Sequence, residues 1–175
     1  QELGQHQQVY SVINTWPTKK WCIGEGVKLA EILNLAGIRP NAQVIRFVSK
    51  DGFAVKLTVQ ELLNDKRYYF PGFKDGAADA DGHIPGSAAG SQLGDSIIAL
   101  KSAEGARDPG YMNDISGLLL MMGQRAVTEQ VGQLFVKGLS RIEVSASSSP
   151  RWDTPKADPA GGDVIKGALI KLSNN

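Results

Sequence analysis

The chain has 175 residues, of which 42% are hydrophobic and 21% charged, and its formal net charge is +1 at pH 7. This composition is ordinary for a globular protein and excludes disorder over the whole length. The nearly neutral charge and the scattered basic residues argue against nucleic-acid binding, which usually requires a basic patch.

Two further classes are excluded by the apolar runs and the cysteine count. The longest uninterrupted apolar run, residues 118–122, is far shorter than the roughly 20 residues of a membrane-spanning helix. We therefore expect no membrane span within these residues. Cys22 is the only cysteine, so an internal disulfide and a cysteine-based zinc site are both excluded. The commonest role of such a residue is a small buried side chain.

The first third of the chain predicts a strand followed by a helix. The first eight residues are polar, residues 9–13 are typical of a strand, and a turn is expected over residues 14–18. Leucine, isoleucine and alanine then recur at helical spacing over residues 29–36. Gly37 is well placed to end this helix in a left-handed conformation.

The next segment predicts a hairpin and a short helix. Residues 44–48 and 53–57 are rich in β-forming residues, and the Asp51-Gly52 pair between them is a strong hairpin signal. Thr58 and Glu61 fit a capping box, which predicts a short helix ending near residue 64.

The middle of the chain predicts a long loop, a strand and a helix. Residues 75–94 have no periodicity and are rich in Gly, Ala, Asp and Ser, which indicates a functional or mobile loop. Residues 95–100 are typical of a strand. Asn113 or Asp114 would then cap a helix over residues 115–122, which Gly117 weakens by roughly 1 kcal/mol relative to alanine.

The end of the chain predicts two closing strands and a change of composition. The strands are expected at residues 134–136 and 141–144, and small polar residues, proline and glycine follow. We expect residues 1–145 to form one domain. Residues 146–175 would be a linker with a trailing strand that packs on it, or the start of a following immunoglobulin-like repeat. The start at Gln1 rather than Met indicates a processed form or a piece of a longer protein.

Several motifs together resemble the molybdopterin-binding domain of the sulfite oxidase family. They are the Gly-Val-Lys-Leu helix at residues 26–33, the Ala-Gly step at 36–37, the Ser-Lys-Asp-Gly-Phe hairpin at 49–53, and the closing Phe-Val-Lys and Ile-Glu-Val strands at 135–137 and 142–144. The resemblance covers roughly residues 9–145. It implies an α+β fold of the sulfite oxidase type, with mixed β-sheets and short flanking helices.

A second set of segments is similar to a branch of this family found in exported proteins of anaerobic Gram-positive bacteria. These segments are residues 14–20, 67–71, 83–87 and 123–130, and the tail from residue 152 is similar to the start of an immunoglobulin-like repeat. The resemblance therefore implies an exported, multi-domain protein of the bacterial cell surface.

One departure from the family bears on the chemistry. The resemblance implies that a cysteine thiolate near the strand before the helix ligates molybdenum, and thiolate is a soft donor that suits such a metal. The matching region, residues 9–14, has no cysteine, and Cys22 lies too close to the helix. We therefore expect no bound cofactor, with molybdopterin held through Cys22 as the alternative.

The candidate binding residues follow from side-chain chemistry and from the resemblance. Arg125 is a candidate anion contact, because a guanidinium group suits phosphate or carboxylate, and its alternative role is to tie down a loop or a helix end. His83, in the glycine-rich loop, is a second candidate that would line a binding pocket. Its alternative role is to form hydrogen bonds within its own loop. The resemblance adds Ser49 and Asn14 at the cleft.

Two other features have a functional and an ordinary explanation. Asp79 and Asp81 match part of a calcium loop, although calcium takes six to eight oxygen ligands and this stretch supplies too few. The aromatic residues Trp16, Trp21, Tyr68, Tyr69 and Phe70 form either a ligand-stacking face or part of the core. Glu104 and Asp108 are expected on a loop.

Three functions stay open. The first is a non-catalytic module that binds a small anionic ligand or presents neighbouring domains of the same chain. The second is a molybdopterin-dependent oxidoreductase domain, which the resemblance alone implies. The third is an adhesion domain stabilised by calcium at Asp79 and Asp81.

Overall fold

The computed structural model describes residues 3–15, 18–73, 88–150 and 170–171. Its strands are β1 (His6–Ile13), β2 (Lys19–Lys28), β3 (Val44–Ser49), β4 (Ala54–Thr58), β5 (Tyr68–Tyr69), β6 (Gln92–Leu93), β7 (Ile97–Glu104), β8 (Asn113–Met121), β9 (Val136–Ser145) and β10 (Ile170–Lys171). Its helices are all short, namely α1 (Leu29–Leu35), the π-helix η1 (Gln60–Asn64) and the 3₁₀ turns η2 (Pro109–Tyr111) and η3 (Val131–Leu134).

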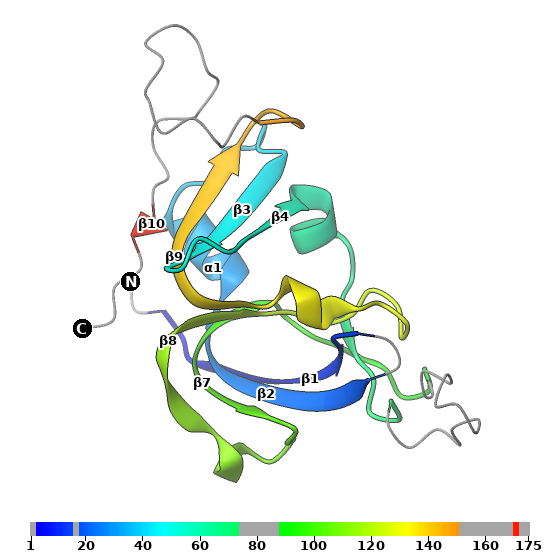
Figure 1. The fold of residues 1–175 in the computed structure, drawn as a ribbon. Helices are drawn as coiled ribbons and strands as arrows, with labels where there is room; N and C mark the ends of the chain where they lie inside the picture. The colour runs from blue at the N-terminus through cyan, green and yellow to red at the C-terminus, as the bar shows by residue number, and fades with distance from the viewer. Residues whose placement is uncertain (1–2, 16–17, 74–87, 151–169, 172–175) are drawn as a thin grey trace, which may run out of the picture.

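One curled sheet dominates the structure. Its strand order is β1-β2-β7-β8-β9-β3-β4, with β10 paired to β9 outside this path, and β5 and β6 form a separate two-stranded sheet. Figure 1 shows β1, β2, β7 and β8 as a curved layer from which β9 bends away to join β3 and β4. The expected combination of sheet and short helices is confirmed at this level. All pairings between described strands are antiparallel, so the prediction of mixed sheets is wrong.

Bulges explain why the sheet curls into a half-barrel. The register shifts at one place in each of four strand pairs: at Glu25/Gly26 between β2 and β7, at Ala99/Lys101 between β7 and β8, at Leu118/Leu119 between β8 and β9, and at Val48/Ser49 between β3 and β9. Each extra residue bends its strand and increases the local twist. Because the shifts occur in successive pairs, their bends add up across the sheet.

Three glycines make these bulges sterically feasible. A Cβ atom on Gly26 would lie 2.6 Å from the Cα atom of Ala99 and would overlap the Ile98 carbonyl group. Gly138 has a φ of 64°, a left-handed conformation that other residues rarely adopt. A Cβ atom on Gly117 would lie 3.1 Å from the Gly138 Cα atom. Gly117 therefore permits a close backbone approach between β8 and β9.

The main core fills the space between the two halves of the curled sheet. Tyr10, Phe47, Leu120 and Ile142 have exposed fractions of 0%, and α1 covers one end with Leu29, Ile32 and Leu33. The Tyr10 hydroxyl donates to the Asp95 carbonyl oxygen at 2.6 Å, which satisfies its one polar atom in the interior. These buried apolar side chains hold the sheet and the short helix α1 together.

A second, aromatic cluster packs beside β1 and β2. Trp21, Phe70 and Phe73 are buried with Ile13, and Trp21 makes edge-on contacts with Tyr69 and Phe73 at centroid distances of 5.6 and 5.8 Å. These side chains face one another. Except for Trp16, which lies outside the described residues, the predicted aromatics are thus core or half-buried residues.

Several local predictions are confirmed. The helix α1 carries the predicted buried stripe, and Gly37 after it has a φ of 71°. Gly52 at the β3–β4 turn has a φ of 92°. Thr58 Oγ1 accepts from the Glu61 amide at 3.0 Å, and the Glu61 carboxylate accepts from the Thr58 amide at 2.9 Å, as a capping box requires.

The predicted helix over residues 115–122 is wrong, because residues 115–121 belong to the strand β8. Its last four positions, Leu118–Met121, are all buried. A strand covered on both faces has a continuous apolar run, and such a run is ambiguous between strand and helix. Asn113 and Asp114 are strand residues rather than caps.

The two predicted closing strands are replaced by one strand, β9. Residues 134–135 end a 3₁₀ turn, and β9 then runs without interruption through the bend at Gly138. Glu104 is the last residue of β7 and not a loop residue, whereas the Asp108 carboxylate caps η2 by accepting from the Gly110 amide at 2.8 Å.

The end of the chain returns to the sheet. Ile170 and Lys171 pair with Ile142 and Arg141 of β9. The division into a domain and a following segment stays a prediction. No helix of the described residues is long and apolar enough to cross a membrane.

Candidate functional site

A cleft of about 980 Å³ opens inside the curl of the sheet. Its walls come from β1, β2, β7, β8 and β9, from the turn before β9, and from the β3–β4 hairpin. Known small-molecule sites have volumes of about 300–1,000 Å³ and are concave and mostly apolar. The size and the position of this cleft make it the candidate site of the described residues.

The floor of the cleft is apolar and tightly packed. It consists of Val12, Cys22, Leu119 and Met121, whose exposed fractions lie between 0% and 7%. These side chains come from β1, β2 and β8, since the alternation of each strand turns every second residue toward the cleft. Gly24, two residues after Cys22, leaves the space that the Met121 sulfur occupies.

The mouth of the cleft carries a carboxylate held between two lysines. Lys20 Nζ lies 2.5 Å from Glu104 Oε1, and Lys137 Nζ lies 3.7 Å from Glu104 Oε2. The hydrogen bond from Lys20, together with both ammonium charges, holds the pKa of Glu104 below its ordinary value. The formal charges of two lysines and one glutamate sum to +1 for this group of three.

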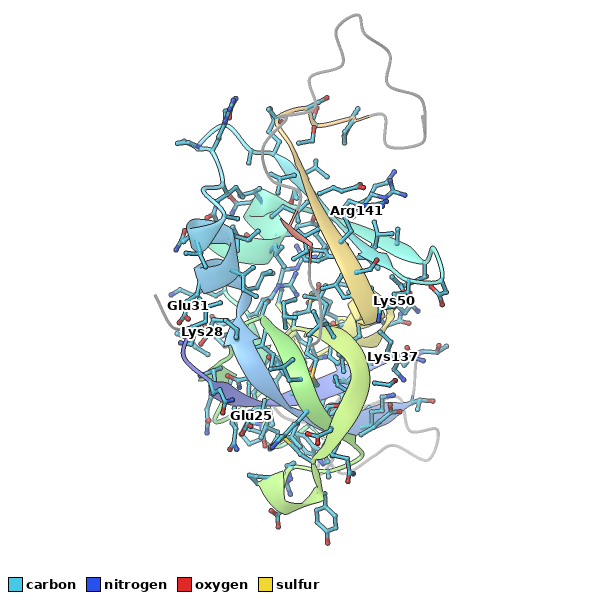
Figure 2. The ribbon with its side chains drawn as sticks, turned by 90° about the vertical axis from the view of Figure 1, so that its left-hand side faces the viewer. Glu25, Lys28, Glu31, Lys50, Lys137 and Arg141 are labelled. Atoms are coloured by element: carbon cyan, nitrogen blue, oxygen red, sulfur yellow. The ribbon has the colours of Figure 1, made fainter. Side chains whose placement is uncertain are left out.

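The β3–β4 hairpin forms the rim opposite β7. Ser49 Oγ donates to the Lys137 carbonyl oxygen at 2.7 Å, and the Lys50 amide donates to the Gly138 carbonyl oxygen at 2.9 Å. Figure 2 shows Lys50 and Lys137 on the same side of the molecule. Phe53, after the turn, is 50% exposed and also lines the cleft. The hairpin is therefore fixed to β9 by hydrogen bonds and presents an aromatic ring and an ammonium group.

The Cys22 thiol is buried at the cleft floor. Burial raises its pKa from 9.0 to about 11, while the nearby Lys20 charge acts in the opposite direction. At neutral pH the group is therefore a protonated thiol. A protonated thiol is a weak nucleophile and a weak metal donor, because both roles belong to the thiolate.

Alkylation of Cys22 is expected to be slow. A pKa of about 11 instead of 9.0 lowers the thiolate fraction at pH 8 roughly 100-fold. Iodoacetamide labelling followed by mass spectrometry should show native Cys22 reacting at least that much more slowly than Cys22 of the chain unfolded in guanidinium. Equal rates would show that the thiol is exposed.

The same shift predicts a loss of stability in alkali. The pKa of Cys22 is higher in the folded chain than in the unfolded chain, so folding favours the protonated thiol. The contribution of this preference to the free energy of unfolding is complete below pH 9 and is lost as the pH rises toward 11. The pKa of Tyr10 is also raised, mainly by burial, and acts in the same direction.

Arg125 does not line the cleft. Its Nε atom lies 2.9 Å from Glu129 Oε1, and its Nη1 atom lies 3.2 Å from Asp65 Oδ2 and 3.8 Å from Glu61 Oε1. The hydrogen bond with Glu129 is the main cause that raises the pKa of Arg125. Three carboxylates thus compensate this guanidinium group in the described structure, which matches its alternative role of tying down a loop.

The structure brings together some of the predicted residues. Asn14, Ser49 and Cys22 line the same cleft, whereas Arg125 lies elsewhere. His83, Asp79 and Asp81 lie outside the described residues, so their predicted roles stay predictions.

The sequence analysis missed the charged group at the cleft mouth. Lys20 and Cys22 share one face of β2, and Cys22 pairs with Glu104 of β7. The alternation of β2 could have placed Lys20 beside Cys22. The partners Glu104 and Lys137 depend on strand pairings between distant segments, for which the sequence has no local signal.

The floor of the cleft offers few ligands for a metal. Besides the Cys22 thiol it consists of Val12, Leu119 and Met121, which add no carboxylate or imidazole group. Among the described residues, no group of three or more His, Cys, Asp or Glu side chains could hold a metal ion.

Comparison with known proteins adds no family assignment. No protein-family model, no curated protein and no solved structure matches the chain.

Proposed function

We propose that the chain is a non-catalytic module that binds a small anionic ligand in the cleft. The proposal places it in an exported bacterial cell-surface protein and gives it the sulfite oxidase-type fold, both of which rest on the sequence resemblance. The observation that carries the binding role is the cleft itself, which joins an apolar floor to a mouth where Lys20 and Lys137 flank a single carboxylate, Glu104. Protein sites with a few polar groups on an apolar surface are typical of small-molecule binding.

The non-catalytic part of the proposal is supported by the chemistry of the residues around the cleft. The only thiol is protonated, and the Ser49 hydroxyl donates to a backbone carbonyl group. Among the described residues, the Ser49 proton is thus directed at a carbonyl group rather than at a base that would make the hydroxyl a nucleophile. Of the cleft carboxylates, Glu104 is paired with lysines and Asp51 accepts from the Phe53 amide at 3.0 Å. None of these groups is poised for proton transfer.

A molybdopterin-dependent oxidoreductase is the second candidate. The observation in its favour is that Cys22 lies at the floor of the same cleft that Asn14 and Ser49 line. A metal at this position would have to lower the pKa of the thiol by several units to obtain a thiolate ligand.

Elemental analysis distinguishes the two candidates. The protein is purified from an anaerobic host supplied with molybdate, and molybdenum is measured per chain by mass spectrometry. The first candidate predicts a content far below one atom per chain, equal in the unsubstituted chain and in Cys22→Ser. Stoichiometric molybdenum that Cys22→Ser loses would overturn it in favour of the oxidoreductase.

A further inference from the structure

We infer that the ligand of the cleft is an organic anion with an apolar body, and that its anionic group takes the place of the Glu104 carboxylate between Lys20 and Lys137. This inference rests on the proposed function, because it names the class of ligand for the same cleft. Three features of the described residues carry it.

The first feature is the arrangement of charge at the mouth. Glu104 places one carboxylate oxygen against each ammonium group, so the two lysines already hold an anionic group with two oxygens. The Glu104 side chain is 57% exposed and ends its strand, so it can turn into water when another anion arrives. An exposed ion pair contributes little stability, and its exchange for another carboxylate or sulfonate therefore costs little.

The second feature is the apolar floor directly below this group. Val12 and Met121 are buried, with exposed fractions of 0% and 1%, and Phe135 is half-buried at the side. An inorganic anion would use the mouth and leave this apolar surface to water. A ligand with an apolar body covers both surfaces and gains the hydrophobic contribution of the floor.

The third feature is the state of the other cleft carboxylates. Asp51 accepts from the Phe53 amide at 3.0 Å, which is the main cause that lowers its pKa, and Asp114 of β8 is the third carboxylate that lines the cleft. Glu104 is paired with two lysines, so removal of its carboxylate leaves two ammonium groups at the mouth. An organic cation would face that repulsion, whereas an anion relieves it.

The test uses two fluorescent probes that share one apolar body. The anionic probe is 8-anilinonaphthalene-1-sulfonate, and the neutral one is N-phenyl-1-naphthylamine. The full chain is expected to bind one molecule of the anionic probe with a Kd about threefold to tenfold below that of the neutral probe, since each of the two exposed ion contacts has a modest effect. Titrations at low and high salt separate the ionic part, because salt screens exposed charges.

Three cleft variants and one matched control make the test specific. Lys20→Met and Lys137→Met should each weaken the anionic probe about threefold to tenfold, and Glu104→Gln should tighten it by a similar factor, because the internal competitor is removed. Lys28→Met is the control. Lys28 lies on the same strand as Lys20 and is also ion-paired, to Asp95 at 2.9 Å, but it does not line the cleft. Its substitution should leave both Kd values unchanged.

The outcomes separate this inference from the proposed function. Equal binding of both probes without any effect of Lys137→Met, which removes a 79% exposed side chain and should not affect folding, would overturn the inference and keep a binding cleft. Weaker rather than tighter binding by Glu104→Gln would also overturn it. Failure of both probes to bind below about 1 mM would overturn the proposed function as well.

Discussion

Gly26→Ala is expected to destabilise the fold by at least about 3 kcal/mol, since a methyl group at this position overlaps backbone atoms that cannot move independently. The added Cβ atom would overlap the carbonyl group of Ile98 and lie 2.6 Å from the Cα atom of Ala99. Both atoms belong to β7, which pairs with β2 at the bulge that curls the sheet. To relieve this overlap, β2 and β7 would have to move apart.

Urea denaturation followed by circular dichroism measures this effect. Gly4→Ala is the matched control, because a Cβ atom on Gly4 has no neighbour within 4 Å. The control should change the free energy of unfolding by no more than about 0.5 kcal/mol. A Gly26→Ala chain with an unchanged urea midpoint would show that β2 and β7 do not approach each other as closely as described.

Arg67→Met is expected to destabilise the fold by about 3 kcal/mol, because it removes a buried charged donor from several acceptors at once. Arg67 is 4% exposed and donates to the Gly123 carbonyl oxygen at 2.8 Å and to the Glu61 carbonyl oxygen at 3.0 Å. Its Nη1 atom lies 3.4 Å from the Glu129 carboxylate. Burial lowers the pKa of Arg67, but the nearby carboxylates counter this.

The neighbouring Arg125 is the control for this prediction. It belongs to the same group of charges, but its side chain is 38% exposed, so Arg125→Met should cost no more than about 1 kcal/mol. Equal stability of Arg67→Met and the unsubstituted chain would mean that the cost of burying the guanidinium group cancels its hydrogen bonds. Arg125→Met should also leave binding of the anionic probe unchanged, which distinguishes the cleft from this surface.

The elements that local chemistry specifies could be predicted from the sequence. The Asp51-Gly52 turn, the Thr58 and Glu61 capping box and the Gly37 helix end each depend on neighbouring residues alone, and the structure contains all three. Such features are encoded by turn and capping preferences that act over a few residues.

The strand β8 and the curl of the sheet could not be predicted in this way. Whether residues 118–121 form a helix or a strand is decided by β7 and β9, which lie on either side of them. The roles of Gly26 and Gly117 depend on backbone atoms of other strands, at Ala99 and Gly138. Tertiary context overrides local preference at such positions.

The candidate site, too, could be predicted only in part from the sequence. Asn14, Ser49 and Cys22 were identified from the resemblance and line one cleft, whereas the charged group at its mouth was not foreseen. Glu104 follows Lys20 by 84 positions and meets it only because β2 pairs with β7. Lys137 reaches Glu104 from a third strand, so the group exists only in the folded chain.

The central claim is that the cleft inside the curled sheet is the binding site of this chain. Amide chemical-shift mapping of the ¹⁵N-labelled chain during titration with the anionic probe tests it most directly. We expect the largest shifts at Lys20, Cys22, Glu104 and Lys137, which surround the cleft. Shifts centred on Arg125 and Asp65, or no saturable shifts at all, would contradict it.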